Sequence, residues 1–298
     1  MTGLGNLIRR NCRLFFRDKG MFFSSLITPI ILLVLYVTFL GNVYRDSFTG
    51  ALPEGFVIED ALLNATVGGQ LISSLLAVCC VTVAFCSNLL MVQDRVSGAR
   101  RDLAVSPVRP STIAVAYFCA SALATLLISL TALAVCLGYL AMAGWLLRAG
   151  DVLFMLLDAA LLTLFGVALS SCVNFPLRTQ GQGSAVGTIV SAGYGFLCGA
   201  YMPISNFSSG LQKVLSFLPG TYGTSLLRNH ALAGAYREMA RVGFPAEVIE
   251  AIRDSIDCNL YFFGRSVSIG GMYAVLVGAT LLLVGLYVLL NALRRERL

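Results

Sequence analysis

The sequence contains six long apolar runs, and segments that carry charged residues separate them. About 20 consecutive apolar residues suffice for a helix to cross the hydrocarbon core of a bilayer. The runs are continuous rather than alternating, which argues against a barrel of membrane-spanning strands. Only 12% of the residues are charged and 57% are hydrophobic, so the bilayer is the solvent for most of this chain. The sequence therefore predicts an all-α polytopic membrane protein.

We expect one domain, residues 1–298, with six transmembrane helices. The predicted spans are residues 22–40, 67–92, 113–146, 152–175, 183–201 and 269–293. The first run is too long for the apolar part of a signal peptide, and no small-residue cleavage site follows it, so we expect no cleavage.

The N-terminal segment, residues 1–20, is predicted to form an amphipathic helix at the membrane interface. Leucines and Phe15 fall on one face at helical spacing, and arginines fall on the other. A basic face suits anionic lipid headgroups, so membrane lipids are an expected partner. The alternative is a plain positively charged anchor that only sets topology.

Basic residues near the spans predict the orientation. Five precede the first span, four lie between the second and third, and three end the chain. Short basic flanks stay on the cytoplasmic side, so both termini are expected in the cytoplasm of a bacterium, with the chain in its inner membrane. Topology explains these charges, and we expect no nucleic-acid partner.

The segment 205–268 is then expected outside the cell. Residues 211–218 have helical spacing and end at Pro219-Gly220, which predicts a re-entrant hairpin in the outer leaflet before the last span. A second, amphipathic helix is predicted to begin at Pro245. Cys258 is the only cysteine in this segment, so we expect no disulfide framework, and thiol labelling from outside should depend on it.

Two titratable residues stand apart from the other charges. Asp158 lies inside the fourth run, where a carboxylate is a functional candidate by default. Its shallow depth leads us to expect that it reaches the headgroups. His230 is the only histidine, and we expect it on the surface.

The loop between the second and third spans, residues 93–112, carries a specific motif. Asp94, Gly98, Leu103 and the run Ser106-Pro107-Val108-Arg109-Pro110 resemble the coupling segment of type 2 ABC exporter permeases. A second stretch resembles the same family: Gly199 and Pro203 form its Gly-x-x-x-Pro turn, followed by Leu218-Pro219 and Arg228. With six spans and the amphipathic N-terminus, the resemblance covers nearly the whole chain.

The resemblance implies a permease subunit that works as a dimer with two separate ATPase subunits. The coupling loop would form a short helix that sits in a cleft of the ATPase. Val96 and Leu103 would supply its apolar anchor, and charged residues its rim. The expected ATPase-coupling residues are Asp94, Arg95, Gly98, Arg101, Asp102, Leu103, Ser106, Pro107 and Arg109. Ala99 and Arg101 depart from the family's common Thr and Glu, and charge alone would also fit a positive-inside loop without a partner.

The fifth run carries two Gly-x-x-x-Gly patterns, which allow helices to approach closely. The resemblance places spans one, two and five around the dimer axis, and the alternative is packing within one chain. The expected dimer or pathway residues are Gln70, Ser73, Ser74, Gly183, Gly187, Gly195, Gly199 and Pro203.

The chain shows no phosphate-binding glycine-lysine loop, zinc spacing or nucleophile motif, so we expect no catalytic or metal residues here, with ATP and Mg²⁺ bound by the partner ATPase. The expected cargo is an amphiphile: a drug, an antibiotic or peptide, or a lipid. A lipid-linked glycan exporter is the alternative within transport. A membrane-embedded lipid-modifying enzyme and a membrane sensor are the alternatives from other classes.

Overall fold

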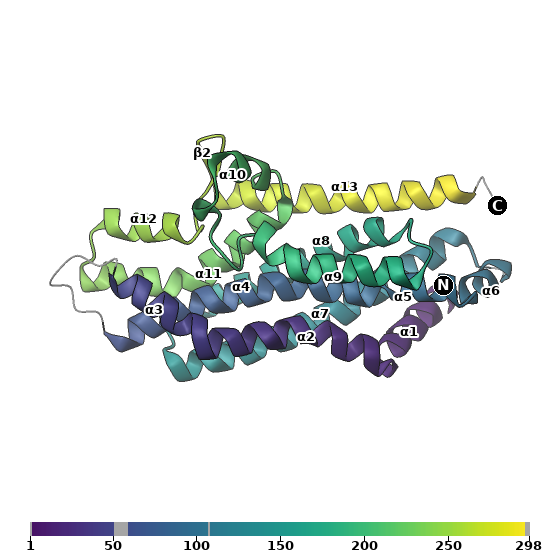
Figure 1. Cartoon of the computed structure of the whole chain (residues 1–298), viewed down its shortest axis with the longest axis horizontal. Helices are drawn as coiled ribbons and strands as arrows, with labels where there is room; N and C mark the ends of the chain where they lie inside the picture. Colours follow the sequence, from purple (N-terminus) through teal and green to yellow (C-terminus); the bar gives the residue numbers. More distant parts are fainter. Residues whose placement is uncertain (1, 51–58, 107, 296–298) are drawn as a thin grey trace.

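The computed structural model describes residues 2–50, 59–106 and 108–295. They form an elongated bundle whose long helices run roughly side by side (Figure 1). The long helices are α2 (Lys19–Leu35), α4 (Asp60–Asn88), α7 (Pro110–Ala143), α8 (Ala149–Asn174), α9 (Gln180–Leu197), α11 (Pro219–Val242) and α13 (Ile269–Arg295). The shorter elements are α1 (Thr2–Arg17), the π-helix η1 (Tyr36–Leu40), α3 (Gly41–Gly50), α5 (Leu90–Val96), α6 (Ala99–Val105), the 3₁₀ turn η2 (Ile204–Asn206), α10 (Ser209–Leu215), α12 (Ala246–Ser255), β1 (Leu260–Phe262) and β2 (Arg265–Val267). The predicted all-α class is confirmed.

The two ends of the bundle differ in what they carry. Both chain termini and α6 lie at one end, called here the terminal end (Figure 1). The opposite end carries α3, α12 and the last part of α11, and is called the far end. The long helices connect the two.

Five helices among the described residues are long and apolar enough to cross a membrane: Lys19–Asp46, Asp60–Val96, Pro110–Ala143, Ala149–Asn174 and Ile269–Leu293. The predicted fifth span corresponds to α9, which is shorter and is not among these five. Glycine, serine, threonine and glutamine dilute its hydropathy. The chain is a multi-pass membrane protein, and a sixth crossing at α9 stays a prediction.

Helix α4 is the centre of the bundle. It packs against α2, α7, α8, α9 and α11. Every residue from Leu76 to Val81 is fully buried, which requires neighbours on all sides. Small residues make this possible. A Cβ atom at Gly166 of α8 would lie 3.1 Å from the carbonyl oxygen of Cys80, so only glycine lets these two helices come this close without a shift.

The bilayer-facing character of the outer helices is visible in their exposed side chains. On α13, exposed apolar residues include Leu281, Leu282, Val288 and Leu289. On α2 they include Ile27, Ile30, Ile31 and Val34. Exposed to water, such apolar stripes would be unfavourable. In a bilayer these side chains contact lipid chains, which are equally apolar.

Helix α1 begins the chain as an amphipathic element. It lies at an angle to the bundle at the terminal end (Figure 1) and packs against α7. Phe15 is buried there, while Arg9, Arg13 and Arg17 are exposed. Asp18 then caps α2, because its carboxylate accepts a hydrogen bond from the backbone N–H of Met21 at 3.1 Å.

The segment after α9 differs from the prediction in one major element. Helices α10 and α12 occupy the regions predicted for a short helix and an amphipathic helix. However, the prediction that Pro219-Gly220 only breaks a helix is wrong. Pro219 is the first residue of α11, a 24-residue helix, because proline fits the first helical turn, where no N–H partner is needed. Helix α11 packs against α4, α8 and α13.

Strands β1 and β2 form an antiparallel hairpin between α12 and α13. Tyr261 pairs with Ser266, and Phe262 pairs with Arg265. The two-residue loop is Phe263-Gly264, and both residues have positive φ, 48° and 81°. This is the backbone that two-residue hairpin loops need, although asparagine is more usual at the first position.

The contact between α4 and α11 gives the first prediction. A Cβ at Gly69 would lie 2.9 Å from the carbonyl oxygen of Ala231 and 2.8 Å from Cδ2 of Leu232. Gly69→Ala should therefore force the helices apart, lower the free energy of unfolding by about 1–3 kcal/mol and lower the melting temperature in detergent.

Gly138→Ala is the matched control, because a Cβ at this position of α7 would meet nothing within 4 Å. It should melt no lower than wild type, since alanine favours a helix over glycine. Equal melting temperatures for the two variants would contradict the close packing of α4 on α11.

Candidate functional site

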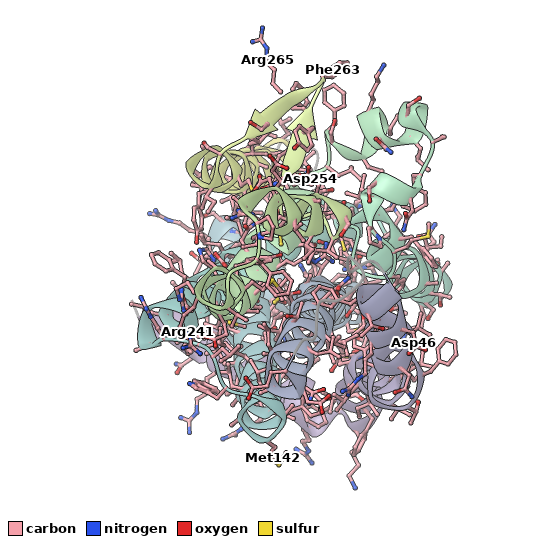
Figure 2. All side chains as sticks on the ribbon, turned by 90° about the vertical axis from the view of Figure 1, so that its left-hand side faces the viewer. Asp46, Met142, Arg241, Asp254, Phe263 and Arg265 are labelled. Atoms are coloured by element: carbon pink, nitrogen blue, oxygen red, sulfur yellow. The ribbon has the colours of Figure 1, made fainter. Side chains whose placement is uncertain are left out.

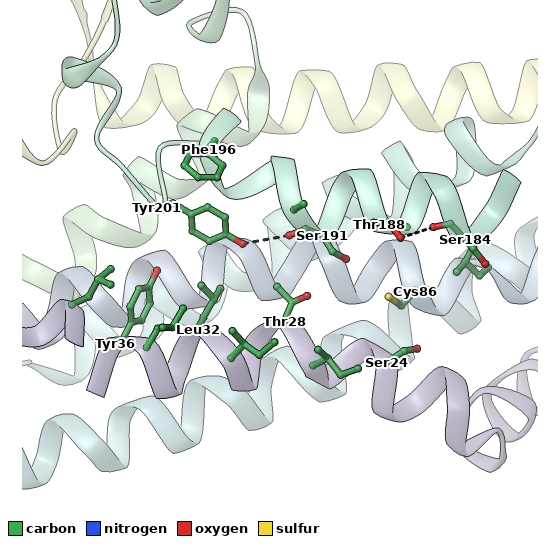
Figure 3. Close-up of a pocket in the computed structure, with 17 residues that line it drawn as sticks. Ser24, Thr28, Leu32, Tyr36, Cys86, Ser184, Thr188, Ser191, Phe196 and Tyr201 are labelled. Atoms are coloured by element: carbon green, nitrogen blue, oxygen red, sulfur yellow. Dashed lines mark hydrogen bonds between the residues drawn. The ribbon is translucent and has the colours of Figure 1, made fainter. Parts of the chain in front are cut away.

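A groove lies between α2 and α9. It has a volume of about 810 Å³ and is open on one side. Figure 3 shows α2 and α9 as its two walls, with Cys86 of α4 between them. Its lining residues are Ser24, Ile27, Thr28, Ile31, Leu32, Leu35, Tyr36, Leu40, Cys86, Leu89, Ser184, Gly187, Thr188, Ser191, Ala192, Phe196 and Tyr201. None of these is charged.

The groove exists because α9 presents small side chains to it. Gly187, Ser191 and Ala192 leave space that larger residues would fill. The hydroxyl of Thr188 bonds to the carbonyl of Ser184 within the helix at 3.0 Å. The wall is therefore mainly apolar with hydroxyl groups spaced along it, which suits an amphiphilic molecule better than an ion.

Aromatic side chains close one end of the groove. The ring of Tyr201 lies across Gly195, where a Cβ would overlap it. Its hydroxyl bonds to the carbonyl of Ser191 at 3.4 Å (Figure 3). Phe196 contacts the same ring edge-on at 5.0 Å between centroids. Gly195 is thus required by packing within the chain.

The other predicted positions, on α9 and in the turn after it, serve packing, the turn or the groove. Gly187 lines the groove. Gly183 packs against Leu89, whose Cδ2 lies 3.1 Å from the position of a Cβ. Gly199 has φ +74° and makes the turn that ends α9, where glycine has the least strain. Pro203 is buried and precedes η2.

The polar residues predicted on α4 do not line the groove. Gln70, Ser73 and Ser74 are all buried among neighbouring helices. Ser73 bonds to the carbonyl of Gln70 at 2.8 Å within α4. Ser74 accepts a hydrogen bond from Arg228 of α11 at 3.1 Å. Ser74 thus joins α4 to α11, whereas Ser73 bonds within its own helix.

Among the described residues, Arg228 is the largest side chain that is fully buried. Its Nη2 donates to Ser74 Oγ and, at 2.9 Å, to the carbonyl of Gly199. Its Nη1 donates to the carbonyl of Ile256 at 2.5 Å and lies 3.7 Å from Asp257 Oδ2. One guanidinium thus joins α4, the turn after α9 and the end of α12. The second stretch that resembles the family, which ends at Arg228, pointed to this arginine, although not to its burial.

Asp257 completes this network from the other side. Its carboxylate accepts hydrogen bonds from the backbone N–H of Ile204 at 2.5 Å and of Ser205 at 3.4 Å. Burial raises the pKa of Asp257, while Arg228 and these amides lower it. The charges on Arg228 and Asp257 therefore hold the turn after α9 against the segment after α12.

Asp158 and His230 correct two predictions. Asp158 does not reach the headgroups: it is fully buried in α8. Its Oδ2 lies 2.6 Å from Nδ1 of His230, and the hydroxyl of Tyr273 donates to its Oδ1 at 2.5 Å. His230 is only partly exposed, and its ring stacks on Phe154 at 4.9 Å. Because α11 brings His230 into the bundle, the carboxylate has partners and need not reach the surface.

The loop with the family motif forms two short helices at the terminal end. Helices α5 and α6 are separated by Gly98, whose φ of +86° makes the sharp change of direction. Among large apolar side chains, Val96 and Val105 are exposed here, the latter at 88%. These two valines give the segment its exposed apolar surface.

Asp94 faces into the bundle rather than outward. Arg10 of α1 binds its carboxylate with two hydrogen bonds, of 2.5 and 3.0 Å. The hydroxyl of Tyr117 on α7 donates to the same carboxylate at 2.6 Å. Bidentate arginine pairs have a strongly preferred geometry. Asp94 therefore fixes α5 to α1 and α7.

Arg95 and Leu103 also contact the protein itself. Arg95 donates to the carbonyls of Phe175, at 2.8 Å, and Leu177. Leu103 is partly buried and packs with Val108 against the apolar cluster at this end. The sequence analysis named Val96 and Leu103 as the apolar anchor for a partner. Val96 is exposed, whereas Leu103 packs inward and Val105 is the second exposed apolar side chain.

The remaining predicted coupling residues lie near the surface. Arg101, Asp102 and Arg109 are exposed. The Ser106 hydroxyl donates to the carbonyl of Leu103 at 2.6 Å, which ends α6. Pro107 lies outside the described residues.

The buried arginine gives a prediction. Arg228→Met should leave Asp257 without its cation, lowering the free energy of unfolding by about 3–5 kcal/mol. Arg241→Met on the same helix is the control, because Arg241 is exposed and its pair with Glu238 contributes little. Thermal melting in detergent measures both. Adding Asp257→Asn to Arg228→Met should restore part of the loss, and a wild-type melting temperature for Arg228→Met would contradict the network.

Comparison with known proteins agrees with this geometry. A search of curated proteins found no match. The family model described as ABC-2 type transporter matches residues 2–231. This range includes the groove, the segment formed by α5 and α6, and Arg228. The chain is a member of the ABC-2 type transporter family, whose members are membrane permease subunits that work with an ABC ATPase.

Proposed function

We propose that the chain is the permease subunit of an ATP-driven exporter and moves an amphiphilic cargo out across a bacterial cytoplasmic membrane. The groove between α2 and α9 is the observation that carries this proposal, because it is uncharged, partly lined by hydroxyls and open to the side. In this proposal the terminal end faces the cytoplasm, and two ATPase subunits bind ATP and Mg²⁺ there.

The exposed part of α5 and α6 would be the surface that the ATPase contacts. Val96 and Val105 supply apolar area, and Arg101, Asp102 and Arg109 supply charges around it. Such a surface, apolar at its centre and charged at its rim, is typical of a protein interface.

A contact pathway connects this surface to the groove. Helix α5 follows α4 directly, and Leu89 at their junction both lines the groove and packs on Gly183 of α9. Asp94 ties the same helix to α1 and α7. A displacement of α5 by ATPase closure would therefore shift α9 relative to α2 and change the width of the groove. ATP would favour one width of the groove over another because the ATPase binds the two conformations of the permease with different affinity.

A second copy of the chain would close the open side of the groove. Exposed apolar residues border it on both walls, with Ile27 and Ile31 on α2 and Phe196 on α9. Two such faces related by a two-fold axis would enclose one pathway between them. One copy supplies one coupling segment, so a dimer would take two ATPases.

The lining favours one class of cargo over the other. Alkyl chains and uncharged hydroxyls suit a lipid, a drug or a lipophilic peptide. A lipid-linked glycan would need a broad polar surface for its sugars. We therefore propose an amphiphile and keep the glycan exporter as the second candidate.

Coupling through α6 is testable with one side chain. Val105→Asp should weaken ATPase binding by about 2 kcal/mol or more, because it puts an unpaired charge into the proposed interface. Cargo-stimulated ATP hydrolysis in proteoliposomes should fall with it. Val242→Asp is the matched control, since Val242 is also exposed but ends α11 at the far end. Equal ATPase binding in both variants would refute the coupling assignment.

Orientation is tested by thiol labelling, and the structure changes the choice of residue. Cys258 is buried, and burial raises the pKa of its thiol to about 11, so it should not react as predicted from the sequence. Glu247→Cys on exposed α12 should label with a membrane-impermeant maleimide in intact cells. Ser97→Cys, at the exposed turn before α6, should label only after permeabilisation. The reverse pattern would invert the proposed topology.

A further inference from the structure

An aromatic patch lies on the surface formed by α10 and the hairpin. It consists of Phe217, Phe262 and Phe263, whose ring centroids are 4.9 to 5.9 Å apart. All three are exposed, Phe217 and Phe263 to about 60%. Figure 2 shows Phe263 and Arg265 at the outer edge of the molecule. Three phenylalanines that contact each other and still face outward need an apolar surrounding.

The tip of the hairpin is unfavourable for phenylalanine in two ways. Phe263 has φ +48°, a conformation in which a bulky side chain is strained and asparagine or glycine is usual. Its ring also gains little from packing, because more than half of it is exposed. Packing on Phe217 and Phe262 therefore does little to offset the backbone strain at Phe263, whereas an apolar surrounding for the exposed ring would.

The surroundings of the patch are amphiphilic. Exposed Val214 extends the apolar area along α10, while exposed Lys213 and Arg265 lie at its edges. Behind the patch, a cavity of about 530 Å³ is lined by Lys213, Gln212 and Asn259 and by the carboxylates of Asp254 and Asp257. Both carboxylates are already bonded within the chain, Asp254 to Asn259 and Tyr261 and Asp257 to Arg228. Apolar tips with the exposed cations Lys213 and Arg265 beside them match a lipid, whose chains are apolar and whose headgroup carries a phosphate.

The position of the patch also points to a lipid surface. Strand β2 ends at Val267, and α13 begins at Ile269, which is exposed. Helix α13 is among the helices long and apolar enough to cross a membrane. The hairpin adjoins the N-terminal end of α13, opposite the end of that helix that leads to the C-terminus (Figure 1). It is therefore placed where this helix would leave the bilayer.

We propose that the aromatic patch inserts into the lipid leaflet at the N-terminal end of α13, and that Lys213 and Arg265 contact the phosphates of the lipid headgroups in that leaflet. This interaction is separate from ATPase coupling and does not depend on the direction of transport.

The patch is connected to the groove. Asp257, just before β1, binds the backbone amides of Ile204 and Ser205 in the turn after α9. Tyr201, in the same turn, lines the groove. Insertion of the patch thus holds the end of the groove near Tyr201 at the level of this leaflet.

The chain has one tryptophan, Trp145, which permits a direct test. In a Trp145→Phe background, Phe263→Trp makes a single-tryptophan protein for reconstitution in phosphatidylcholine and phosphatidylglycerol nanodiscs. Its emission should be blue-shifted, strongly quenched by lipids with nitroxide groups high on the acyl chain, and weakly quenched by aqueous iodide. Glu247→Trp in the same background is the control on exposed α12 and should show the opposite quenching.

Two results would overturn the proposal. Iodide quenching of Phe263→Trp equal to that of Glu247→Trp would place the patch in water. Protection from both quenchers would mean that a protein, either a second copy or another partner, covers it. Folding is checked by the melting temperature of each variant, and Phe217→Trp provides a second probe at the same patch.

Discussion

The fold depends on the burial of α4 from every side. A helix without a lipid-facing side must have small residues where its neighbours approach, and Gly69, Ser73, Ala77 and Cys80 provide this. Because α2, α7, α8, α9 and α11 all contact α4, its position sets theirs. Two of these neighbours, α2 and α9, stay apart from each other, and the space between them above α4 is the groove.

Buried polar groups then fix the ends of this bundle. In a low-dielectric interior an arginine is stable only with partners, and Arg228 has them on three separate segments. At the terminal end, the ion pair between Asp94 and Arg10 joins α5 to α1. Both networks adjoin the moving parts of the proposed cycle, the turn after α9 and the coupling helices. In the proposed cycle these networks would allow the two parts to transmit a displacement.

The sequence predicted the class and the long apolar helices well, because hydropathy over 20 residues reports directly on burial in a bilayer. It failed on α11, where buried Thr224, Arg228 and Asn229 gave a polar pattern that hydropathy assigns to a loop. The pairing of Asp158 with His230 was missed for the same reason, since His230 lies on that helix. The coupling motif was recognisable, but only packing distinguishes inward Leu103 from outward Val105.

The central claim is that one chain is half of a transporter, completed by a second copy over the groove and by two ATPases at the terminal end. Native mass measurement tests it most directly, on the complex purified in mild detergent after co-expression with the ATPase. The account predicts a mass equal to two copies of the 31.8 kDa permease and two ATPase subunits. A stable single permease chain with no ATPase bound would contradict it.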